Sequence, residues 1–473
     1  MKTTPQTTAL ADLEVDALVV PILSDPSLPG GATHAIDQAL DGLLGRLHAR
    51  GDLDTRVGRT TPLFPERGVA APRVLVVGLG AAGTLDADAV RRAAAGALRQ
   101  ARDLGARRVG LAPLGAGLGP IDLATAVAAT VEGARLGLYR YADDEGVDEV
   151  LLATDEARLE DVRDAVRLAE ATAEGVALAR ELVNRPPNVA TPEHLAEVAR
   201  GLAADHGFAL TVGDRAWAAE HGMGAFLAVA QGAGHEPRFL VLEHDPTGGQ
   251  EPPLVLVGKG VTFDSGGVSI KGRAGMEAMK SDMAGAAAAL GTMRTLGRLR
   301  AARRVIALVP ATENLLDAHA YRPADVITAA NGTTIEIIST DAEGRLLLAD
   351  ALSYAQRLRP RAVVDLATLT GAVVVALGEG IAAGRFANDD ALAAQLDAAA
   401  AATAERTWPL PLWKDYLKDL ESDVADLKNS SGKPRGGAAV AAAFLERFVD
   451  YPWVHLDIAG MAMSDKVDGY RTK

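Results

Sequence analysis

The sequence predicts an α/β protein of two domains, and three observations support this fold class. A chain of 473 residues is longer than one hydrophobic core usually organises. Short apolar runs alternate with stretches of helical spacing along nearly the whole chain. The longest helical pattern ends at the proline pair of "RPPN". We therefore expect an N-terminal α/β domain over 1–157, a connecting helix over 158–184 and a C-terminal domain over 185–473.

The N-terminal domain is predicted to contain a parallel sheet. Its apolar runs are short, rich in Val, Leu and Ile, and followed by turn residues, as in strands buried on both faces. These candidate strands cover 17–23, 73–80, 108–114 and 149–154. A helical pattern over 87–105 separates two of them, which is typical of a parallel βαβ unit.

The C-terminal domain repeats this alternation and predicts a mostly parallel sheet. Its candidate strands cover 238–244, 253–260, 303–311, 333–339, 361–369 and 453–460. Helical patterns separate most of them, including an amphipathic stretch over 346–358. The alanine-rich segment 390–406 carries charges at helical spacing, so we expect a surface helix there. Ligand sites in such sheets gather beyond the carboxyl ends of the strands.

Composition and charge exclude several classes of function. The net charge of −14 argues against nucleic acid as the main partner. The chain contains no cysteine, which excludes disulfides, thiol catalysis and zinc sites built on thiolates. The N-terminus shows no signal peptide or targeting extension, and no stretch has the roughly 20 apolar residues that span a bilayer. We expect a cytoplasmic enzyme that does not act at a membrane.

Charged residues crowd into two stretches of the C-terminal domain, "STDAEGRLLLADAL" (339–352) and "LVGKGVTFDSGGVSIKGRAGMEAMKSDMAGAAAAL" (256–290). Each stretch places acidic residues at strand ends or beside glycine-rich turns. The four acids are Asp264, Asp282, Asp341 and Glu343. An unpaired buried carboxylate costs several kcal/mol, so four neighbouring ones need cations. Without cysteine or paired histidines, a divalent metal would have oxygen ligands, and two carboxylate-bridged metals can activate water.

Other interpretations of these residues stay open on spacing alone. Each acid taken singly fits a helix cap or a solvated surface position, and the metal site and this plainer interpretation carry comparable weight. "FDSGG" is similar to the nucleophile loop of trypsin-like proteases, but the α/β pattern and the absence of a paired histidine disfavour Ser265 as a nucleophile. "GLG" at 78–80 continues poorly into a dinucleotide-binding fingerprint, and we interpret it as a turn.

The two charged stretches resemble one known family. "STDAEGRL" resembles the signature octapeptide NTDAEGRL of the leucyl aminopeptidases, the M17 family of cytosolic two-metal exopeptidases. "VGKGVTFDSGG" and "MKSDMAGAAA" match that family in order and spacing, and "NRPPNVATP", "DLATLTGA" and "HLDIAG" resemble further segments. The resemblance covers the second domain. It implies a macro-like N-terminal α/β domain and a zinc-exopeptidase-like catalytic domain with a mostly parallel, mixed central sheet.

The resemblance implies two divalent ions, Mn²⁺ or Zn²⁺, with a bridging water or hydroxide as the nucleophile. One ion would be held by Lys259, Asp264, Asp282 and Glu343, and the more exchangeable one by Asp264, Asp341 and Glu343. A lysine ligand must lose a proton whose reference pKa is about 10.4, which two neighbouring dications favour. Lys271 would stabilise the oxyanion, and Arg345 would hold a bicarbonate ion as general base.

The same resemblance gives expectations for substrates and partners. Peptides with a free N-terminus would bind a metal through the amine. The apolar pocket for the first side chain, suited to leucine or methionine, would be lined by Met279, Thr368, Gly371 and Ala459. Family members assemble as homohexamers. Two positions depart from the family pattern: Ser339 replaces the usual asparagine, and His319 stands where a small residue is common.

Two other functions remain alternatives at the level of sequence. A two-metal phosphoesterase uses carboxylate-bridged metals in the same way, and turnover of phosphate esters without peptide cleavage would favour it. A hexameric scaffold with a decayed site is the non-enzymatic alternative. All five metal-ligand positions and both catalytic positions carry the family residue, which favours an active aminopeptidase over this scaffold.

Overall fold

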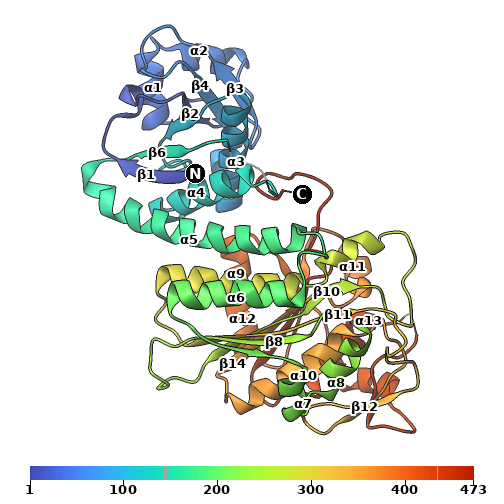
Figure 1. Cartoon of the computed structure of the whole chain (residues 1–473). Coiled ribbons are helices and arrows are strands. Elements are labelled where there is room, and N and C mark those ends of the chain that lie inside the picture. Colours follow the sequence, from blue (N-terminus) through green and yellow to red (C-terminus); the bar gives the residue numbers. More distant parts are fainter. Residues whose placement is uncertain (143–145, 434, 473) are drawn as a thin grey trace. The chain divides into compact units, whose positions relative to one another are not determined.

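The computed structural model describes residues 1–142, 146–433 and 435–472, and the chain divides into two compact units (Figure 1). Unit 1 contains residues 1–177 together with the residues from Asp465 on, and unit 2 contains residues 178–464. The predicted α/β class is confirmed in both. None of the helices in the described part of the chain is long and apolar enough to cross a membrane.

Unit 1 is a six-stranded sheet with helices on both faces. The strand order is β1-β6-β5-β2-β4-β3, and all neighbours are parallel except β3 and β4. The strands are β1 (Lys2–Gln6), β2 (Ala17–Ile22), β3 (Thr60–Leu63), β4 (Val74–Gly78), β5 (Arg108–Leu111) and β6 (Glu149–Ala153). The helices are α1 (Ala32–Ala39), α2 (Leu43–Arg50), α3 (Ala87–Asp103), α4 (Leu123–Leu138) and the first part of α5 (Leu159–Asn184).

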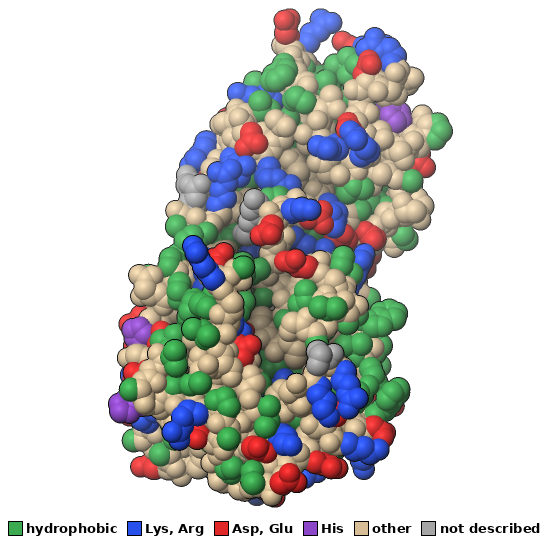
Figure 2. All heavy atoms as spheres, turned by 90° about the vertical axis from the view of Figure 1, so that its right-hand side faces the viewer, with side chains coloured by type: hydrophobic (Ala, Val, Ile, Leu, Met, Phe, Trp, Pro, Cys, Tyr) green, Lys and Arg blue, Asp and Glu red, His purple; other side chains and the backbone are tan. Residues whose placement is uncertain are grey.

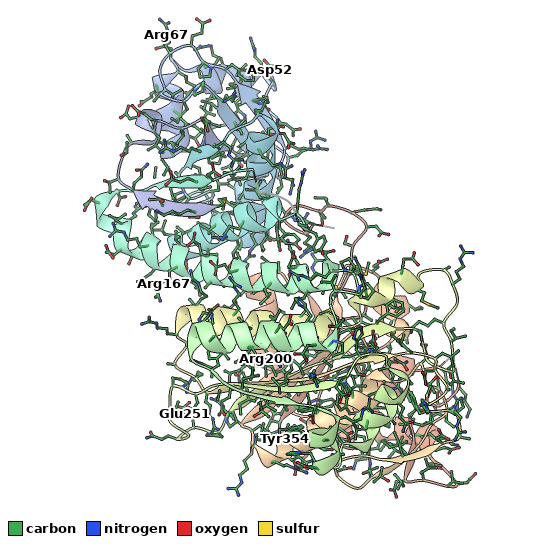
Figure 3. The ribbon with its side chains drawn as sticks, in the orientation of Figure 1. Asp52, Arg67, Arg167, Arg200, Glu251 and Tyr354 are labelled. Carbon is green, nitrogen blue, oxygen red and sulfur yellow. The ribbon has the colours of Figure 1, made fainter. Side chains whose placement is uncertain are left out.

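The core of unit 1 explains why its strands are so apolar. Side chains of α3, α4 and α5 pack on one face of the sheet and those of α1 and α2 on the other, so the central strands β2 and β4 are buried throughout. Several charged side chains lie at the surface, and Asp52, Arg67 and Arg167 are exposed and point outward from this unit in Figure 3.

The residues after Asp465 complete unit 1. Tyr470 is 3% exposed and packs with Ala95, Leu136 and Ala173, from three different helices. Its hydroxyl donates to Asp88 Oδ1 at 2.9 Å. The segment therefore adds a buried aromatic residue to a core that is otherwise built from the first 177 residues.

Unit 2 is built on a nine-stranded mixed sheet. The order is β16-β15-β18-β14-β9-β11-β8-β7, with β10 paired to β11, and β18, β14, β9 and β11 form its parallel centre. The strands are β7 (Ala209–Gly213), β8 (Arg238–His244), β9 (Leu254–Gly258), β10 (Gly260–Asp264), β11 (Val305–Asn314), β14 (Ala362–Ala367), β15 (Ala383–Ala387), β16 (Thr407–Pro409) and β18 (Trp453–Asp457). Antiparallel strands lie at both edges.

Helices cover both faces of this sheet (Figure 1). One face packs against α6 (Pro192–His206), α9 (Ala284–Leu299) and α12 (Asp390–Thr403). The other packs against α8 (Gly224–Val229), α10 (Gly344–Arg357) and α13 (Gly437–Glu446). The short helices α7 (Arg215–Glu220) and α11 (Gly371–Leu377) complete the unit. Acidic, basic and hydrophobic side chains are interspersed over the face of the molecule in Figure 2.

Two glycines bring the start of α9 unusually close to the sheet. A Cβ added to Gly285 would lie 2.0 Å from the Leu366 carbonyl oxygen, and one added to Gly258 would lie 2.4 Å from the Gly285 carbonyl oxygen. The helix formed by "MAGAAAAL", whose side chains are small, therefore packs tightly, and its first turn is buried at the ends of β9 and β14.

One predicted strand belongs to a different sheet from the one expected. The run 333–339 was expected in the central sheet, but only Thr334–Glu336 is extended, as β13. It pairs with β12 (Val326–Thr328) and β17 (Leu427–Lys428) in a separate three-stranded sheet. This small sheet leads directly into α10 and so positions the signature octapeptide.

A candidate metal centre in unit 2

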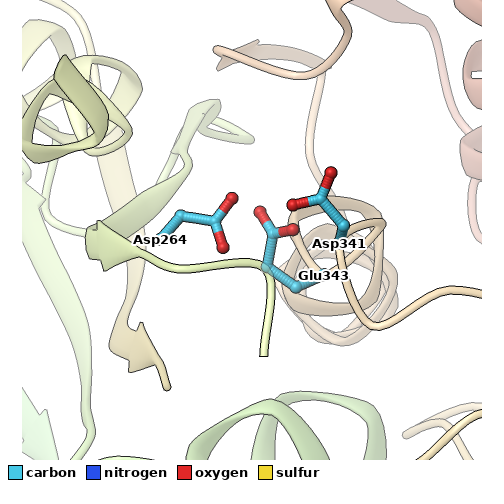
Figure 4. A group of neighbouring side chains, drawn as sticks. All are labelled: Asp264, Asp341 and Glu343. Carbon is cyan, nitrogen blue, oxygen red and sulfur yellow. The ribbon is translucent and has the colours of Figure 1, made fainter. Parts of the chain in front are cut away.

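The acidic residues of the two charged stretches meet at the carboxyl ends of the central strands. Asp264 is the last residue of β10, while Asp341 and Glu343 lie in the turn that enters α10. Figure 4 shows their three carboxylates pointing toward one another. One oxygen from each lies within 4.8 Å of the other two, which is a spacing that a metal ion can bridge. The structure thus brings three of the four predicted acids together in one group.

Lys259 joins the fourth acid to this cluster. It follows β9 directly and is 2% exposed. Its Nζ lies 2.8 Å from Asp282 Oδ1 and 2.8 Å from Glu343 Oε1, and it donates to the Thr368 carbonyl at 2.9 Å. Gly344 makes room for it, because a Cβ there would lie 2.6 Å from the Lys259 Cε.

Lys271 lies at the more open side of the cluster. Its Nζ is 2.7 Å from Asp264 Oδ2 and 2.6 Å from Asp341 Oδ1. Its side chain is 22% exposed and that of Asp341 39%, against 3% for Lys259. A molecule arriving from solvent would therefore meet Lys271 and Asp341 before the buried pair.

The close packing of charges shifts several pKa values. Burial by itself would lower the pKa of Lys259, but Asp282, Glu343 and Asp264 outweigh it and raise that pKa. Lys271 shows the same balance, with Asp264 and Glu343 raising its pKa against burial. Burial raises the pKa of Asp282, Asp341 and Glu343, and neighbouring carboxylates add to the effect. The protein alone thus holds four crowded carboxylates with two ammonium groups.

The donor set fits divalent metal ions. Four carboxylates outnumber the two lysines, so the cluster carries excess negative charge that dications would balance. Asp282 Oδ2 is buried and has no hydrogen-bond partner. A buried orphan acceptor of this kind normally has a ligand or ion to satisfy it. Carboxylate oxygens suit Mn²⁺ and Zn²⁺ alike.

Arg345 is the second residue of α10 and lies beside the cluster. It is 8% exposed, and its Nη1 donates to the Asn429 carbonyl at 2.7 Å. Burial lowers its pKa to about 10, although Glu343 and Asp457 favour the charged form. The guanidinium is therefore still charged at neutral pH, and its buried Nε has no hydrogen-bond partner. The Nε of Arg345 can therefore donate a hydrogen bond to a small anion.

Sequence reasoning missed two asparagines that support the cluster. Asn314, the last residue of β11, donates to Asp264 Oδ1 at 2.8 Å and to the Thr340 carbonyl at 2.9 Å. Asn429 accepts from the Ile338 amide at 2.8 Å and donates to the Ser339 carbonyl at 2.7 Å. Both amides are fully buried. Neither asparagine stands in a local sequence pattern that could have suggested this role.

The residues expected to contact the first side chain lie at different distances from the cluster. Thr368 touches it, because its hydroxyl donates to Asp282 Oδ1 at 2.6 Å. Gly371 opens α11, and Ala459 follows β18 and packs beside α11. Met279 lies in the 3₁₀ turn Met276–Ser281, where its carbonyl accepts from the Asp282 amide at 3.3 Å.

Ser339 and His319, the two residues that depart from the family pattern, have different surroundings. Ser339 Oγ accepts a hydrogen bond from the Asp341 amide at 3.2 Å, so the serine itself supports the octapeptide turn. His319 is exposed in the loop after β11, where its amide donates to Asp317 Oδ1 at 2.6 Å.

Comparisons with known proteins identify the family to which both parts of this chain are similar. The catalytic-domain model of the cytosol aminopeptidase family matches residues 177–473, and its N-terminal-domain model matches 19–143. A probable cytosol aminopeptidase of Syntrophotalea carbinolica is 48% identical over 442 residues, covering 91% of this chain and 88% of that protein. One of Roseiflexus castenholzii is 43% identical over 470 residues, covering 97% and 93%.

Solved structures give the same result for the whole chain. The bottromycin maturation enzyme BotP in complex with Mn is 38% identical, with a TM-score of 0.84 and coverage of 96% of this chain and 94% of that chain. A mutant of tomato leucine aminopeptidase is 34% identical, with a TM-score of 0.86 and coverage of 98% and 93%. Both units of the fold therefore have counterparts in proteins of known structure.

Proposed function

This chain belongs to the cytosol aminopeptidase family and is a metal-dependent aminopeptidase, and from that premise we propose how its residues release the first residue of a peptide. The observation that carries the proposal is the convergence of Asp264, Asp341 and Glu343 within 4.8 Å. Lys259 and Asp282 extend this cluster through salt bridges of 2.8 Å.

We assign the metal ligands by combining this cluster with the family pattern. Lys259, Asp264, Asp282 and Glu343 would hold one ion, and Asp264, Asp341 and Glu343 would hold the other. The buried, unpartnered Asp282 Oδ2 and the greater exposure of Asp341 support a tighter and a more exchangeable site, respectively. When bound, the two ions supply the positive charge that activates water and polarises the peptide carbonyl. Mn²⁺ and Zn²⁺ both suit these ligands.

Lys271 stabilises the negative charge that develops on the carbonyl oxygen of the substrate. Its ammonium is held in place by Asp264 and Asp341, and its partial exposure leaves it accessible to a peptide. Those neighbouring acids raise its pKa against the effect of burial, so it stays a donor at neutral pH. A positioned donor of this kind contributes about 2.7–4 kcal/mol to lowering the barrier.

Arg345 binds a bicarbonate ion that serves as the general base. Its side chain is fixed by the Asn429 carbonyl, while its Nε keeps a free hydrogen-bonding position. A bicarbonate ion held there by Arg345 would supply the general base for proton transfer between the attacking water and the leaving amine.

The substrate is a peptide with a free N-terminus, preferably beginning with leucine or another apolar residue. Met279, Thr368, Gly371 and Ala459 would contact that first side chain. Such a pocket separates neighbouring apolar residues by about 1–3 kcal/mol at most, so we expect a broad preference. The protein would act in the cytoplasm as a homohexamer.

The test is release of the first residue from a leucyl dipeptide and from its N-acetylated form. Chelator-treated protein is assayed alone and after addition of Mn²⁺ or Zn²⁺. We expect metal-dependent cleavage of the free peptide and none of the acetylated one. Lys271→Gln should keep both metal ions, measured by elemental analysis, and lose about 100-fold or more of kcat.

Two outcomes would overturn the proposal. One is the absence of peptide cleavage by protein that is folded and metal-loaded, and turnover of phosphate esters in its place would favour a phosphoesterase. The other is equal cleavage of the acetylated peptide, because that would remove the role of the free amine. For the bicarbonate base, activity that does not respond to added bicarbonate in carbonate-free buffer would exclude it.

A further inference from the structure

The buried carboxylate of Asp457 is hydrogen-bonded to two segments of the chain. These segments carry Thr368, Gly371 and Ala459, three of the four residues expected to contact the first side chain of the substrate. Asp457 is the last residue of β18 and is 1% exposed. Its Oδ1 accepts hydrogen bonds from the Leu369 amide at 3.1 Å and the Thr370 amide at 3.4 Å. The same oxygen accepts from the Ala459 amide at 3.2 Å.

The second oxygen of Asp457 fixes the same turn from another side. Thr370 Oγ1 donates to Asp457 Oδ2 at 2.6 Å and accepts from the Val373 amide at 3.2 Å, so it also caps α11. Both carboxylate oxygens of Asp457 are thus used between the end of β14 and the start of α11. A carboxylate that accepts several hydrogen bonds holds the groups that donate them in fixed positions.

Thr368 connects the turn held by Asp457 to the metal cluster. That residue immediately precedes the anchored turn, and its hydroxyl and carbonyl contact Asp282 and Lys259 at 2.6 and 2.9 Å. The charge of Asp457 also acts on Arg345, where it favours the protonated guanidinium. Asp457 therefore contacts the segments that carry the expected side-chain contacts, and its charge also influences Arg345, which would hold the general base.

We propose that Asp457 is a positioning residue that sets the shape of the first-residue pocket and thereby the choice of substrate side chain. This inference rests on the proposed function, because the pocket is the one formed by Thr368, Gly371 and Ala459. Both carboxylate oxygens of Asp457 accept hydrogen bonds from protein groups, and the residue is not one of those that we assign to the metal ions or to the first side chain. Its effect comes from holding the turn at Leu369–Thr370 at a fixed distance from Ala459.

The experiment compares Asp457→Asn with wild-type enzyme, both metal-loaded, on leucyl, methionyl and alanyl dipeptides. Asparagine keeps one acceptor oxygen but has no charge, and its amide group cannot accept from Thr370. We expect kcat/KM for the leucyl peptide to fall about tenfold or more, and the leucyl-to-alanyl ratio to change several-fold. Thr370→Val keeps the charge of Asp457 but removes both hydrogen bonds of the Thr370 hydroxyl, the one to Asp457 and the one from the Val373 amide. It should change the ratio in the same direction, whereas Thr370→Ser, which keeps the hydroxyl, should retain the wild-type ratio.

Asp350→Asn is the matched control. Asp350 is also a fully buried carboxylate of unit 2 that accepts backbone hydrogen bonds, from Phe226 at 2.8 Å and Ala330 at 2.7 Å, and it lies outside the site. It should alter stability and leave the leucyl-to-alanyl ratio unchanged. Selectivity is a ratio within one preparation, so it does not depend on the folded fraction.

The inference is overturned if Asp457→Asn keeps the wild-type ratio, or if Asp350→Asn changes the ratio as much. Its failure is distinguishable from failure of the proposed function. Wild-type enzyme that does not cleave peptides removes both, whereas an active wild type with unchanged selectivity in the Asp457 variant removes only the positioning role.

Discussion

The ammonium of Lys259 lies 2.8 Å from the carboxylate of Asp282, with only 3% and 7% of the two side chains exposed. A buried pair of this kind is costly to break, because removal of one partner leaves an uncompensated charge out of water. This salt bridge also joins the end of β9 to the start of α9, two parts of the chain that are 23 positions apart in the sequence.

Lys259→Met should destabilise the chelator-treated protein by about 3–5 kcal/mol, because Asp282 and Glu343 lose their shared counter-charge. Added Mn²⁺ should recover part of this loss, since dications neutralise the same carboxylates. The free energy of unfolding, measured by denaturant titration with and without metal, checks both statements. Equal stability of variant and wild type in chelator would contradict the role given to this salt bridge.

Gly344→Ala should impair activity through Lys259. The new Cβ would lie 2.6 Å from the lysine Cε and 2.7 Å from its Nζ, and the buried side chain has no room to withdraw. We expect kcat/KM to fall about tenfold or more. Gly201→Ala is the control, because nothing lies within 4 Å of its added Cβ on α6. It should leave kinetics unchanged and raise stability by about 0.5–1 kcal/mol.

The raised pKa of Asp350 should make the free energy of unfolding depend on pH. Burial raises its pKa to about 7 in spite of backbone hydrogen bonds from Phe226, Ala330 and Ala225, which lower it. The folded state thus keeps a proton that the unfolded chain releases near pH 4. The contribution of this group to stability therefore falls as pH rises from about 4 to 7, by at most about 1.4 kcal/mol per pH unit.

Asp350→Asn removes that titration, so the difference in unfolding free energy between wild type and variant should shift against the wild type from pH 5 to pH 7. Denaturant titrations at several pH values measure this difference. A difference that stays constant across this range would show that Asp350 has an ordinary pKa in the folded protein.

Tyr470→Ala should destabilise unit 1. The ring is buried among Ala95, Leu136 and Ala173, and loss of a buried aromatic side chain costs about 3–5 kcal/mol. Tyr470→Phe loses only the hydrogen bond to Asp88 and should cost about 1 kcal/mol. Limited proteolysis with mapping of the cut sites measures opening within residues 1–177. Cuts confined to residues 178–464 would contradict this assignment.

Much of the fold could be predicted because its signals are local. The buried parallel strands of both units, such as 17–23 and 361–369, are apolar runs, and periodicity identifies α5 and α10 directly. The position of "TTIEII" was predicted wrongly, because alternation identifies a strand without indicating which sheet it joins. Only tertiary pairing with Leu427 and Lys428 places β13 in its separate sheet.

The candidate site could be predicted in part for a similar reason. Its charged residues lie in two short stretches, so their crowding is visible in the sequence. The residues that position them are distant and chemically ordinary. Asn314 reaches Asp264 across 50 positions, Asn429 reaches Ile338 across 91, and Asp457 reaches Thr370 across 87. A single neutral amide or a lone acid after a strand gives no local signal of such a role.

The packing of Tyr470 into unit 1 sets an order of events during synthesis. The first 177 residues leave the ribosome early, but the slot between Ala95, Leu136 and Ala173 stays unfilled until the chain has been made past residue 470. Residues 178–464 are translated in between, which takes about 15–60 s at typical elongation rates. During that interval the N-terminal unit exposes apolar surface that a chaperone can bind, and its last contacts form only after the catalytic unit has been synthesised.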